Sequence, residues 1–492
     1  MKVKDFHELS ELGDPVVIQA KVLGSEQKLT QVYLAERATE QYQAKLRWNS
    51  NEKGWHCYDY ESGMWQRIGS EKIIALLMDT LLEMRLLEAQ KIKVSGAIRG
   101  SAIKEIERAE SSGFLNGTET LMRSMQSLTI DASAFDADPY LVGLDNGQVL
   151  DLRTSSVRSI QQADYLTKRI NAPHIEGAIC PLWEKSILEW SCGDKELARF
   201  LQVWCGYCMS ALTGFQGFLF LYGSGRNGKS VFLNTMSKLL GPYSIAMKSD
   251  TLMQKTFTGG ASGDIARLNG VRFATCNELS EGKHFDEELL KMLTGQDTMT
   301  ARFNYKDDFN FTPSLKLMIC GNHQPVIKGT DAGIWRRVNL VPFIAKIAKV
   351  DPDLARKLNE EFAGILNWCI EGWKIYQQQG IVIPKAVTEA TAQYRAEMDV
   401  IGQWLDEATT KKIGSKAALK DLYQSYRDWC NENGFRAIPT SKGLNRKLKE
   451  GRLGEPLRCS AGGYYPDLKI KDGVEDSYYE TYTPTSHRFD KD

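Results

Sequence analysis

The feature that most constrains this chain is the segment Gly223-Ser-Gly-Arg-Asn-Gly-Lys-Ser230, which has the spacing G-x-x-x-x-G-K-[ST]. A strand-like apolar stretch, 218–222, precedes it, and a stretch with helical spacing, 231–240, follows it. In this context the glycines let the backbone bend so that successive N–H groups point at phosphate oxygens. A chance glycine turn is the alternative, and the two correct flanks argue against it. The sequence therefore predicts a phosphate-binding loop.

The loop residues have distinct expected roles toward a nucleotide. Lys229 is expected to act in catalysis by reaching the β- and γ-phosphates, and the Ser230 hydroxyl is expected to bind the metal. The expected cofactors are therefore ATP and Mg²⁺. The residues expected to bind the nucleotide are Gly223, Ser224, Gly225, Arg226, Asn227, Gly228, Lys229 and Ser230.

Two later apolar stretches end in polar residues, as strands do at the ligand edge of a parallel sheet. Residues 271–276 are followed by Asn277 and Glu278, and we expect Glu278 to polarise the attacking water and to help hold the metal. A solvated loop acid is the alternative. Residues 316–320 are followed by Gly321 and then Asn322, which can sense the γ-phosphate, although Asn is common in ordinary turns.

Two adjacent arginines, Arg336 and Arg337, follow a tryptophan. Such a pair suits an arginine finger, which stabilises transition-state charge in the site of a neighbouring subunit. A solvated helix face is the alternative. The sequence leaves open which arginine is the finger, with slightly better spacing for Arg337.

These motifs, in this order, resemble those of the superfamily-3 helicases. The nearest resemblance is to the phage and plasmid primase-helicase C-terminal family, which includes the poxvirus primase-helicase. Residues 146–152 resemble its strand ahead of the motor, 201–207 its helix before the loop, and 293–306 its DNA-contacting hairpin. The resemblance covers about residues 70–460. The family's paired acids are reduced here to the single acid Glu278.

The resemblance implies an α/β fold class with an AAA+-type P-loop core and a helical, collar-like N-terminal domain. It also implies a ring of six subunits around single-stranded or forked DNA. The DNA-binding residues would be Arg302, Asn304, Tyr305 and Lys306, with the cations on phosphates and the tyrosine stacking. An ordinary charged turn is the alternative, because Asp307 and Asp308 follow.

The expected function is an ATP-dependent hexameric DNA helicase that acts in the replication of a phage, plasmid or other mobile element. An ATP-switched initiator or loader with little unwinding is the alternative, and an ATPase used against a host is a third. A primase or another replication protein is an expected partner.

Two motifs imitate metal sites. Asp136-Ala-Asp138 imitates a primase metal site, but we interpret it as a turn. We interpret Cys205 and Cys208 as core residues and not as zinc ligands.

The length of 492 residues predicts several domains. Strand-like stretches at 16–23 and 31–34, and an aromatic hairpin at 54–66, suggest a β-rich start, whereas helical spacing dominates after Ser70. Near the end, helices at 417–430 and 441–449 resemble a winged helix with a basic second helix. The expected domains are a small β-rich segment (1–70), a mostly helical domain (71–205), the ATPase core (206–380), a winged-helix-like domain (381–465) and a flexible tail (466–492).

The composition limits the compartment in which the protein works and the partners that it can have. Lys and Arg number 62 and so do Asp and Glu, so no overall positive field indicates nucleic-acid binding, although a ring can enclose its positive charge. The first residues carry no apolar signal core, and the longest apolar run, near 215–221, is too short to cross a bilayer. Apart from Cys205 and Cys208, the ten cysteines have no paired spacing. These features predict a cytoplasmic protein with free thiols and no membrane partner.

Overall fold

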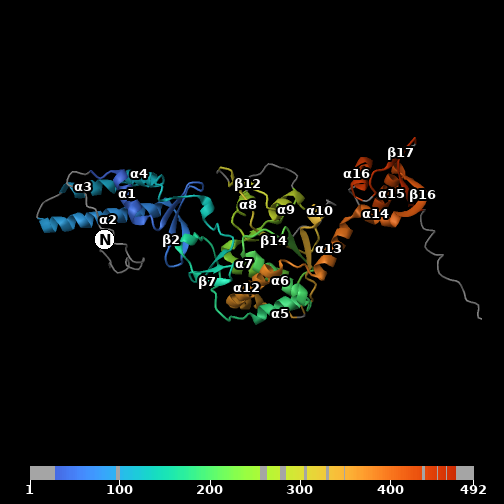
Figure 1. Ribbon diagram of the computed structural model, residues 1–492, viewed down its shortest axis with the longest axis horizontal. Helices are drawn as coiled ribbons and strands as arrows, with labels where there is room; N and C mark the ends of the chain where they lie inside the picture. The colour runs from blue at the N-terminus through green and yellow to red at the C-terminus, as the bar shows by residue number, and fades with distance from the viewer. Residues whose placement is uncertain are drawn as a thin grey trace, which may run out of the picture.

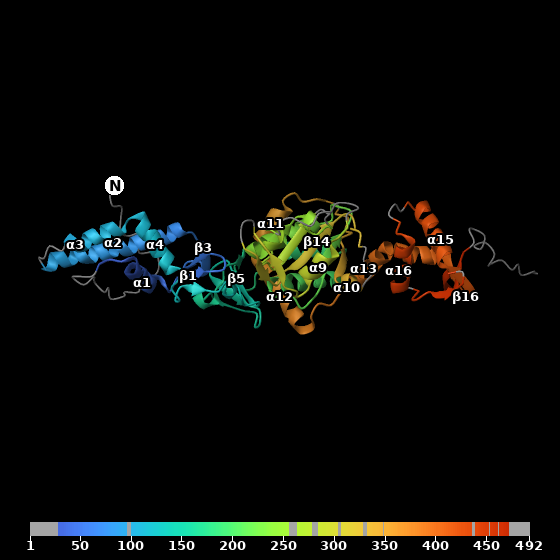
Figure 2. The same cartoon turned by 90° about the horizontal axis from the view of Figure 1, so that it is seen from above.

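The computed structural model describes residues 28–95, 100–254, 263–277, 284–303, 307–327, 332–347, 349–434, 438–451, 453–460 and 462–471. These residues form an elongated molecule in which three units follow one another along the long axis (Figure 1, Figure 2). No helix among the described residues is both long and apolar enough to cross a membrane.

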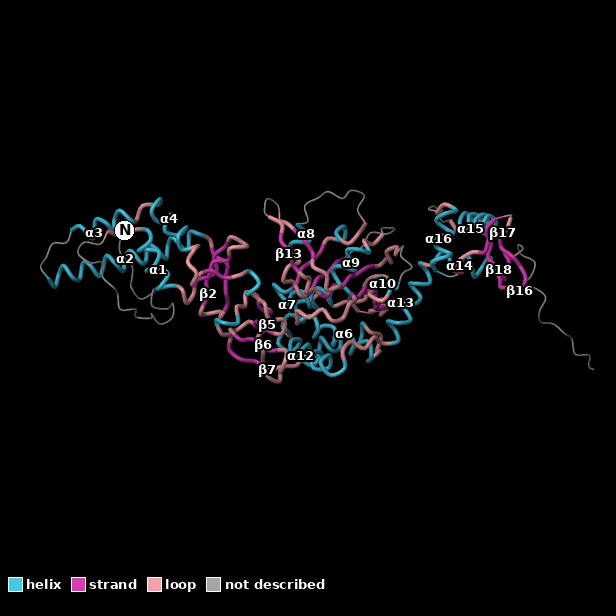
Figure 3. Tube along the Cα trace, turned by 45° about the horizontal axis from the view of Figure 1, so that its top comes forward, coloured by secondary structure: helices cyan, strands magenta, loops and turns pink. Residues whose placement is uncertain are grey.

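The N-terminal unit combines helices with a small sheet (Figure 3). The sheet has the order β3-β2-β1-β4. The hairpin expected around residues 54–66 is confirmed as β2 and β3. The elements are α1 (Gln31–Tyr42), β1 (Leu46–Asn49), β2 (Gly54–Asp59), β3 (Met64–Ile68), α2 (Ser70–Ser95), α3 (Gly100–Ala109), α4 (Ser112–Met122) and β4 (Thr129–Ile130).

Two expectations for this unit are wrong. Residues 31–34 begin helix α1 and do not form a strand, because the Thr30 hydroxyl accepts a hydrogen bond from the Tyr33 N–H and caps the helix. The boundary expected after residue 70 is absent, because Leu34 of α1 and Ile73 of α2 share one buried core. The strand expected at 16–23 lies outside the described residues.

A second small sheet connects the N-terminal unit to the centre and has the order β7-β6-β5-β8. The turn expected at Asn146-Gly147 is confirmed, with φ of 123° and 69° at the two residues. The boundary expected between residues 205 and 206 falls inside helix α6 and is wrong, because residues before and after it pack in one core. The elements are β5 (Leu141–Leu144), β6 (Gln148–Asp151), β7 (Ser156–Ser159), β8 (Arg169–Ile170), α5 (Pro181–Trp190) and α6 (Lys195–Met209), with short 3-10 turns at Ala132–Ala134 and Gln162–Asp164.

The central unit is an α/β layer built on a parallel sheet with the order β10-β11-β14-β9-β15. Its strands are almost continuously apolar because hydrophobic cores cover both faces. The strands are β9 (Phe218–Tyr222), β10 (Ser244–Met247), β11 (Phe273–Asn277), β14 (Lys316–Gly321) and β15 (Val338–Pro342). The other elements are α7 (Lys229–Leu240), α8 (Gly263–Ala266), α9 (Glu287–Thr294), β12 (Met299–Ala301), β13 (Phe309–Phe311), α10 (Ala332–Trp335), α11 (Leu354–Glu360) and α12 (Phe362–Gln379), with 3-10 turns at Gly241–Tyr243 and Ser249–Thr251.

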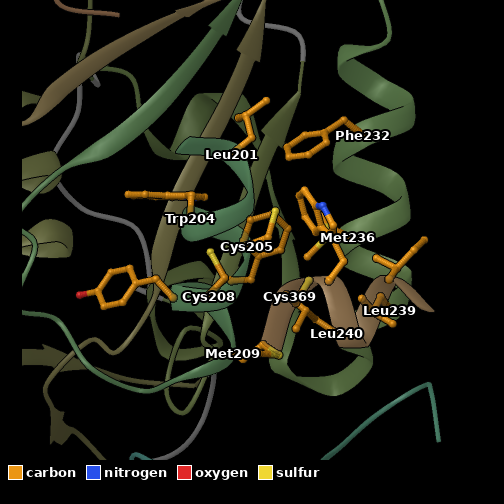
Figure 4. Close-up of a cluster of buried hydrophobic side chains, with 14 of the residues drawn as sticks. Leu201, Trp204, Cys205, Cys208, Met209, Phe232, Met236, Leu239, Leu240 and Cys369 are labelled. Carbon is orange, nitrogen blue, oxygen red and sulfur yellow. The ribbon is translucent and has the colours of Figure 1, made fainter. Parts of the chain in front are cut away.

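The two motifs that imitate metal sites are structural. Figure 4 shows Cys205, Cys208 and Cys369 among apolar side chains of the core. The Asp136 carboxylate accepts a hydrogen bond from the Thr167 N–H at 2.9 Å, and that of Asp138 pairs with the Arg153 guanidinium. Within the described residues, no cluster of three or more His, Cys, Asp or Glu side chains could hold a metal.

The C-terminal unit has its own small core, but it begins later than expected. Helix α13 packs on the central unit, because the buried Tyr394 belongs to the core around β15. The following elements enclose a separate core in which Trp404, Leu422 and Leu444 are buried, and their sheet has the order β16-β18-β17. The elements are α13 (Lys385–Met398), α14 (Val400–Ala408), β16 (Thr409–Ala418), α15 (Leu419–Glu432), α16 (Ser441–Gly451), β17 (Leu457–Cys459) and β18 (Gly462–Ile470).

Two buried cations hold the amino edge of the central sheet. Arg272 donates hydrogen bonds to the carbonyls of Met209 (2.6 Å) and Leu141 (2.9 Å). The Lys316 ammonium donates to the carbonyls of Ser210 and Leu212. The carbonyls of Met209, Ser210 and Leu212 lie at or just beyond the end of α6, where the helix dipole favours positive charge, whereas the Leu141 carbonyl belongs to β5. The two side chains thus fix the segment that connects α6 to the P-loop strand β9.

Burial of Lys316 predicts a pH-dependent stability. Desolvation lowers the pKa of Lys316 from 10.5 to about 7. An unfolded chain therefore binds more protons at this residue than the folded chain between about pH 7 and pH 10.5, so the free energy of unfolding should rise with pH in that window. The Lys316→Met variant should show a smaller rise, measured as urea midpoints at pH 7 and pH 9. The exposed Lys104→Met variant is the control, and an unchanged slope in Lys316→Met would contradict the assignment.

Candidate nucleotide site

The predicted phosphate-binding loop connects β9 to α7, and its glycines are required by close contacts. Gly225 and Gly228 have positive φ, at 96° and 89°. A Cβ at Gly223 would lie 2.0 Å from the Phe343 carbonyl oxygen, and one at Gly228 would lie 2.3 Å from the Trp190 indole nitrogen. The loop therefore has room only for glycine where it meets the end of β15 and helix α5.

Lys229 is the first residue of α7, and its side chain folds back into the loop. The ammonium donates hydrogen bonds to the Gly223 carbonyl at 2.7 Å and to the Asn227 side-chain oxygen at 2.8 Å. The Asn227 amide in turn donates to the Phe343 carbonyl. The Lys229 side chain is buried, and this burial lowers its pKa. An anion bound in the loop would favour the charged form of this lysine.

The loop opens onto a pocket of about 240 Å³ at the carboxyl edge of the sheet. Residues 225–231 form one wall, and Cys320, Gly321 and Asn322 form the other. These walls meet because β9 and β14 are neighbours, with Tyr222 opposite Gly321 in register. The start of α7 presents N–H groups that have no partner within the helix. The pocket thus brings Asn322 together with the loop residues that the sequence singled out.

The expected catalytic acid cannot be placed in this geometry. Asn277 is the last residue of β11 and lies opposite Cys320, whose strand β14 leads to Asn322. Glu278 follows directly in the chain but lies outside the described residues. Its assignment as the acid and metal ligand therefore stays a prediction.

The two arginines differ in their surroundings. Arg336 is exposed and donates a hydrogen bond to the Gln216 side-chain oxygen at 3.0 Å. Arg337 is buried, donates to the Gly333 carbonyl at 2.6 Å, and accepts a backbone bond from Phe218. Both precede β15 at the amino edge of the sheet, whereas the loop follows β9 at the carboxyl edge. A five-residue strand, about 16 Å long at about 3.3 Å per residue, separates the two edges.

The expected hairpin is present as β12 and β13, which pair antiparallel with Ala301 opposite Phe309. At its described outer end, the Arg302 guanidinium lies 3.7 Å from the Asp308 carboxylate. Phe303 stacks on Phe309 with a centroid distance of 5.8 Å. The other three candidate DNA-binding residues, Asn304, Tyr305 and Lys306, lie outside the described residues.

Two family models match the chain. One, described as D5 N terminal like, matches residues 35–192, and the other, a family of unknown function (DUF5906), matches residues 221–337. "Putative helicase L207/L206" of Acanthamoeba polyphaga mimivirus is 27% identical in an alignment of length 435 that covers 80% of this chain and 45% of that protein. "Putative helicase 022R" of Frog virus 3 is 32% identical in an alignment of length 268 that covers 50% of this chain and 28% of that protein.

A third relative carries a different name. "Putative primase C962R" of African swine fever virus is 21% identical in an alignment of length 376 that covers 67% of this chain and 38% of that protein. The chain is thus similar to viral proteins named as putative helicases and as a putative primase, and part of it matches the D5 N terminal like family. It spans less than half the length of each of these viral relatives.

Several site residues were not predicted from the sequence. Trp190 and Phe343 shape the loop, and Gln216 holds the exposed arginine. All three are distant in sequence from the residues they contact, and no local pattern marks them. The loop itself fits a triphosphate with its metal, because a buried lysine, a hydroxyl and helix-end N–H groups converge on one pocket.

Proposed function

We propose that this chain is an ATP-dependent DNA helicase that works as a ring of six subunits in the replication of a virus, phage, plasmid or other mobile element. The observation that carries the proposal is the pocket in which the loop residues 225–231 face Asn322. The viral relatives named as helicases and as a primase support replication as the setting.

The side chains divide the work of hydrolysis. Bound ATP with Mg²⁺ supplies the phosphoanhydride bond that is broken. Lys229 would leave its contacts with Gly223 and Asn227 and neutralise charge on the terminal phosphates. The Ser230 hydroxyl would hold the metal, and Glu278 would take a proton from the attacking water. Asn322, on the facing wall, is suited to orient that water and to sense the γ-phosphate.

The size of the pocket favours a site shared between subunits. Its volume of about 240 Å³ lies below the roughly 300–1,000 Å³ typical of small-molecule sites, so it suits the phosphates better than a whole nucleotide. The remaining surface would come from a neighbour. Arg336, exposed at the opposite edge of the sheet, is too far away to act on its own pocket and is the better candidate for the finger. Buried Arg337 would position it through the shared Gln216.

The alternative function, an initiator or loader that binds duplex DNA, rests on the C-terminal unit. Its order of elements and its sheet order β16-β18-β17 suit a winged helix. Helix α16 buries Leu444 and Leu448 and exposes Lys442, Arg446 and Lys447. Strand displacement on a forked duplex separates the two functions, because a loader should hydrolyse ATP yet displace little strand.

The first prediction for this function concerns Lys229. The Lys229→Ala variant removes the charge that offsets developing negative charge on the phosphates, so ATP turnover should fall to near background. The measurement is steady-state ATPase, with a thermal unfolding curve to show that the fold is kept. Turnover above half of the wild-type value would refute the assignment.

A second prediction tests whether the arginines act in trans. An Arg336→Ala/Arg337→Ala subunit keeps a sound phosphate loop, and a Lys229→Ala subunit keeps sound arginines. Mixing the two should restore part of the ATPase activity that each variant lacks, because active sites then form at some subunit interfaces. Mass measurement should confirm mixed oligomers. If mixed rings form without any recovery, the arginines do not act in trans.

A third prediction concerns the hairpin. Replacing Arg302 and Lys306 by alanine should sharply reduce unwinding and DNA-stimulated hydrolysis, because phosphate contacts are lost. The slope of log affinity against log salt should flatten by roughly 0.7 per lost contact on single strands. Tyr305→Ala should weaken binding with little change in slope, since stacking is not ionic. Wild-type unwinding with an unaltered slope would mean that the hairpin is structural.

A further inference from the structure

The N-terminal unit contains a larger cavity, of about 470 Å³, that is separate from the nucleotide pocket. It lies where the turn between β1 and β2 faces the start of α2, in the part of the unit that adjoins the centre of the molecule (Figure 1). Its lining is unusual in joining cations with indole rings. The lining includes the indole rings of Trp48 and Trp55 and the cations Lys53, Arg67 and Arg123.

Ring contacts and hydrogen bonds connect the residues at the floor of this cavity. The Trp48 and Trp55 rings pack with centroids 5.1 Å apart, and the Arg123 guanidinium lies 4.8 Å above the Trp48 ring. The buried Glu119 carboxylate accepts hydrogen bonds from the Trp55 indole (2.8 Å), the Ser70 hydroxyl (3.0 Å) and Arg123 (2.7 Å). The charge of Arg123 is therefore balanced within the floor, and this arginine is a positioning residue.

Arg67 and Lys53 supply the accessible positive charge. The Arg67 guanidinium covers Gly54 so closely that a Cβ there would lie 2.9 Å from its Nε. Among the described residues, no carboxylate lies within ion-pair distance of Arg67, and its guanidinium donates one long hydrogen bond, of 3.4 Å, to the Glu52 carbonyl. The Glu71 carboxylate lies beside Gly69, which lines the cavity, and brings a negative charge to that wall.

Lys53 connects the cavity to the motor. Its ammonium lies 3.3 Å from the carboxylate of Asp307, on the connection between β12 and β13. The two side chains are 75% and 92% exposed, so their pairing is weak and is screened by salt. The Asp307 carboxylate is therefore paired with the Lys53 ammonium, and another anion can replace it there.

We propose that this cavity binds the phosphate backbone of a single DNA strand, which continues from the β12–β13 hairpin onto Arg67 and Lys53. The proposal rests on the proposed helicase function and adds a second contact to it. A single phosphodiester strand fits, because its phosphates can enter a concave site whose mouth carries two exposed cations, whereas a duplex would have to remain outside. The strand would displace Asp307 from Lys53, so DNA binding would release the hairpin from the N-terminal unit.

The test uses the full chain and a fluorescent oligo(dT) strand, with affinity measured by anisotropy over a range of salt. The Lys53→Gln/Arg67→Gln variant should bind at least tenfold more weakly at low salt, and its salt slope should flatten by roughly 0.7 for each lost contact. Lys104→Gln/Arg108→Gln, which removes two exposed cations from α3 of the same unit, should bind as the wild type does. Thermal unfolding checks that both variants fold.

A second variant tests the competition at Lys53. Asp307→Asn should tighten oligo(dT) binding, and the gain should vanish when Lys53→Gln is also present, because the carboxylate then has no cation to occupy. A gain that persists without Lys53 would show that Asp307 acts only by repelling DNA at the hairpin, and the proposed displacement would be overturned.

The remaining outcomes distinguish free phosphate from a DNA strand as the ligand. They also distinguish failure of the helicase function from failure of the cavity proposal alone. Inorganic phosphate and ATP are added as competitors at concentrations matched in phosphate. If either one displaces oligo(dT) from the wild type but not from Lys53→Gln/Arg67→Gln, the cavity is a site for free anions. That result would overturn the strand proposal. A wild-type chain that binds no oligo(dT) would refute the helicase function itself. Wild-type binding that Lys53→Gln/Arg67→Gln leaves intact would refute the cavity alone.

Discussion

The structure around the nucleotide pocket depends on the contact between the phosphate-binding loop and the end of β15. Gly223 lies against the Phe343 carbonyl, Asn227 donates to that carbonyl, and Lys229 donates to Asn227. This series of contacts joins the loop after β9 to the strand that begins directly after the two arginines. A change in the position of Lys229 can therefore reach β15, and through it the segment proposed to contact the neighbouring subunit.

The two edges of the central sheet have opposite chemistry. At the carboxyl edge, helix-end N–H groups and Lys229 suit an anion. At the amino edge, Arg272 and Lys316 bind carbonyl groups at the end of α6 and so fix the connection that enters β9. Buried cations are costly unless they are hydrogen-bonded, and here each has backbone acceptors. The fixed amino edge holds the connection from which β9 leads to the loop, and the proposed binding of phosphate depends on the position of that loop.

The N-terminal unit is linked to the central unit in two ways that differ in strength. The sheet β5–β8 shares the apolar core of the central unit, so it cannot move independently of that unit. Between Lys53 and Asp307, by contrast, the link is an exposed ion pair that costs little to break. The arrangement combines a firm connection with a weak one near the hairpin, and the weak one is where DNA is proposed to enter.

The sequence by itself determined the features that local chemistry decides. The phosphate loop, the apolar strands beside it and the turn at Asn146-Gly147 follow from residue types at fixed spacing, because glycine and the flanking periodicity constrain the backbone directly. For the strand expected at 31–34, local pattern was ambiguous, since a short apolar run suits a helix equally well, and the cap at Thr30 decided it.

Only the tertiary structure decided which distant residues meet. It placed Asn322 opposite the loop, separated exposed Arg336 from buried Arg337, and ran one core through the boundary expected at residue 205. It also gathered Arg67 and Arg123 around two tryptophans from segments whose sequence shows no shared motif. Packing selects such contacts over long chain separations, and the residue spacing that marks a loop or a strand contains no information about them.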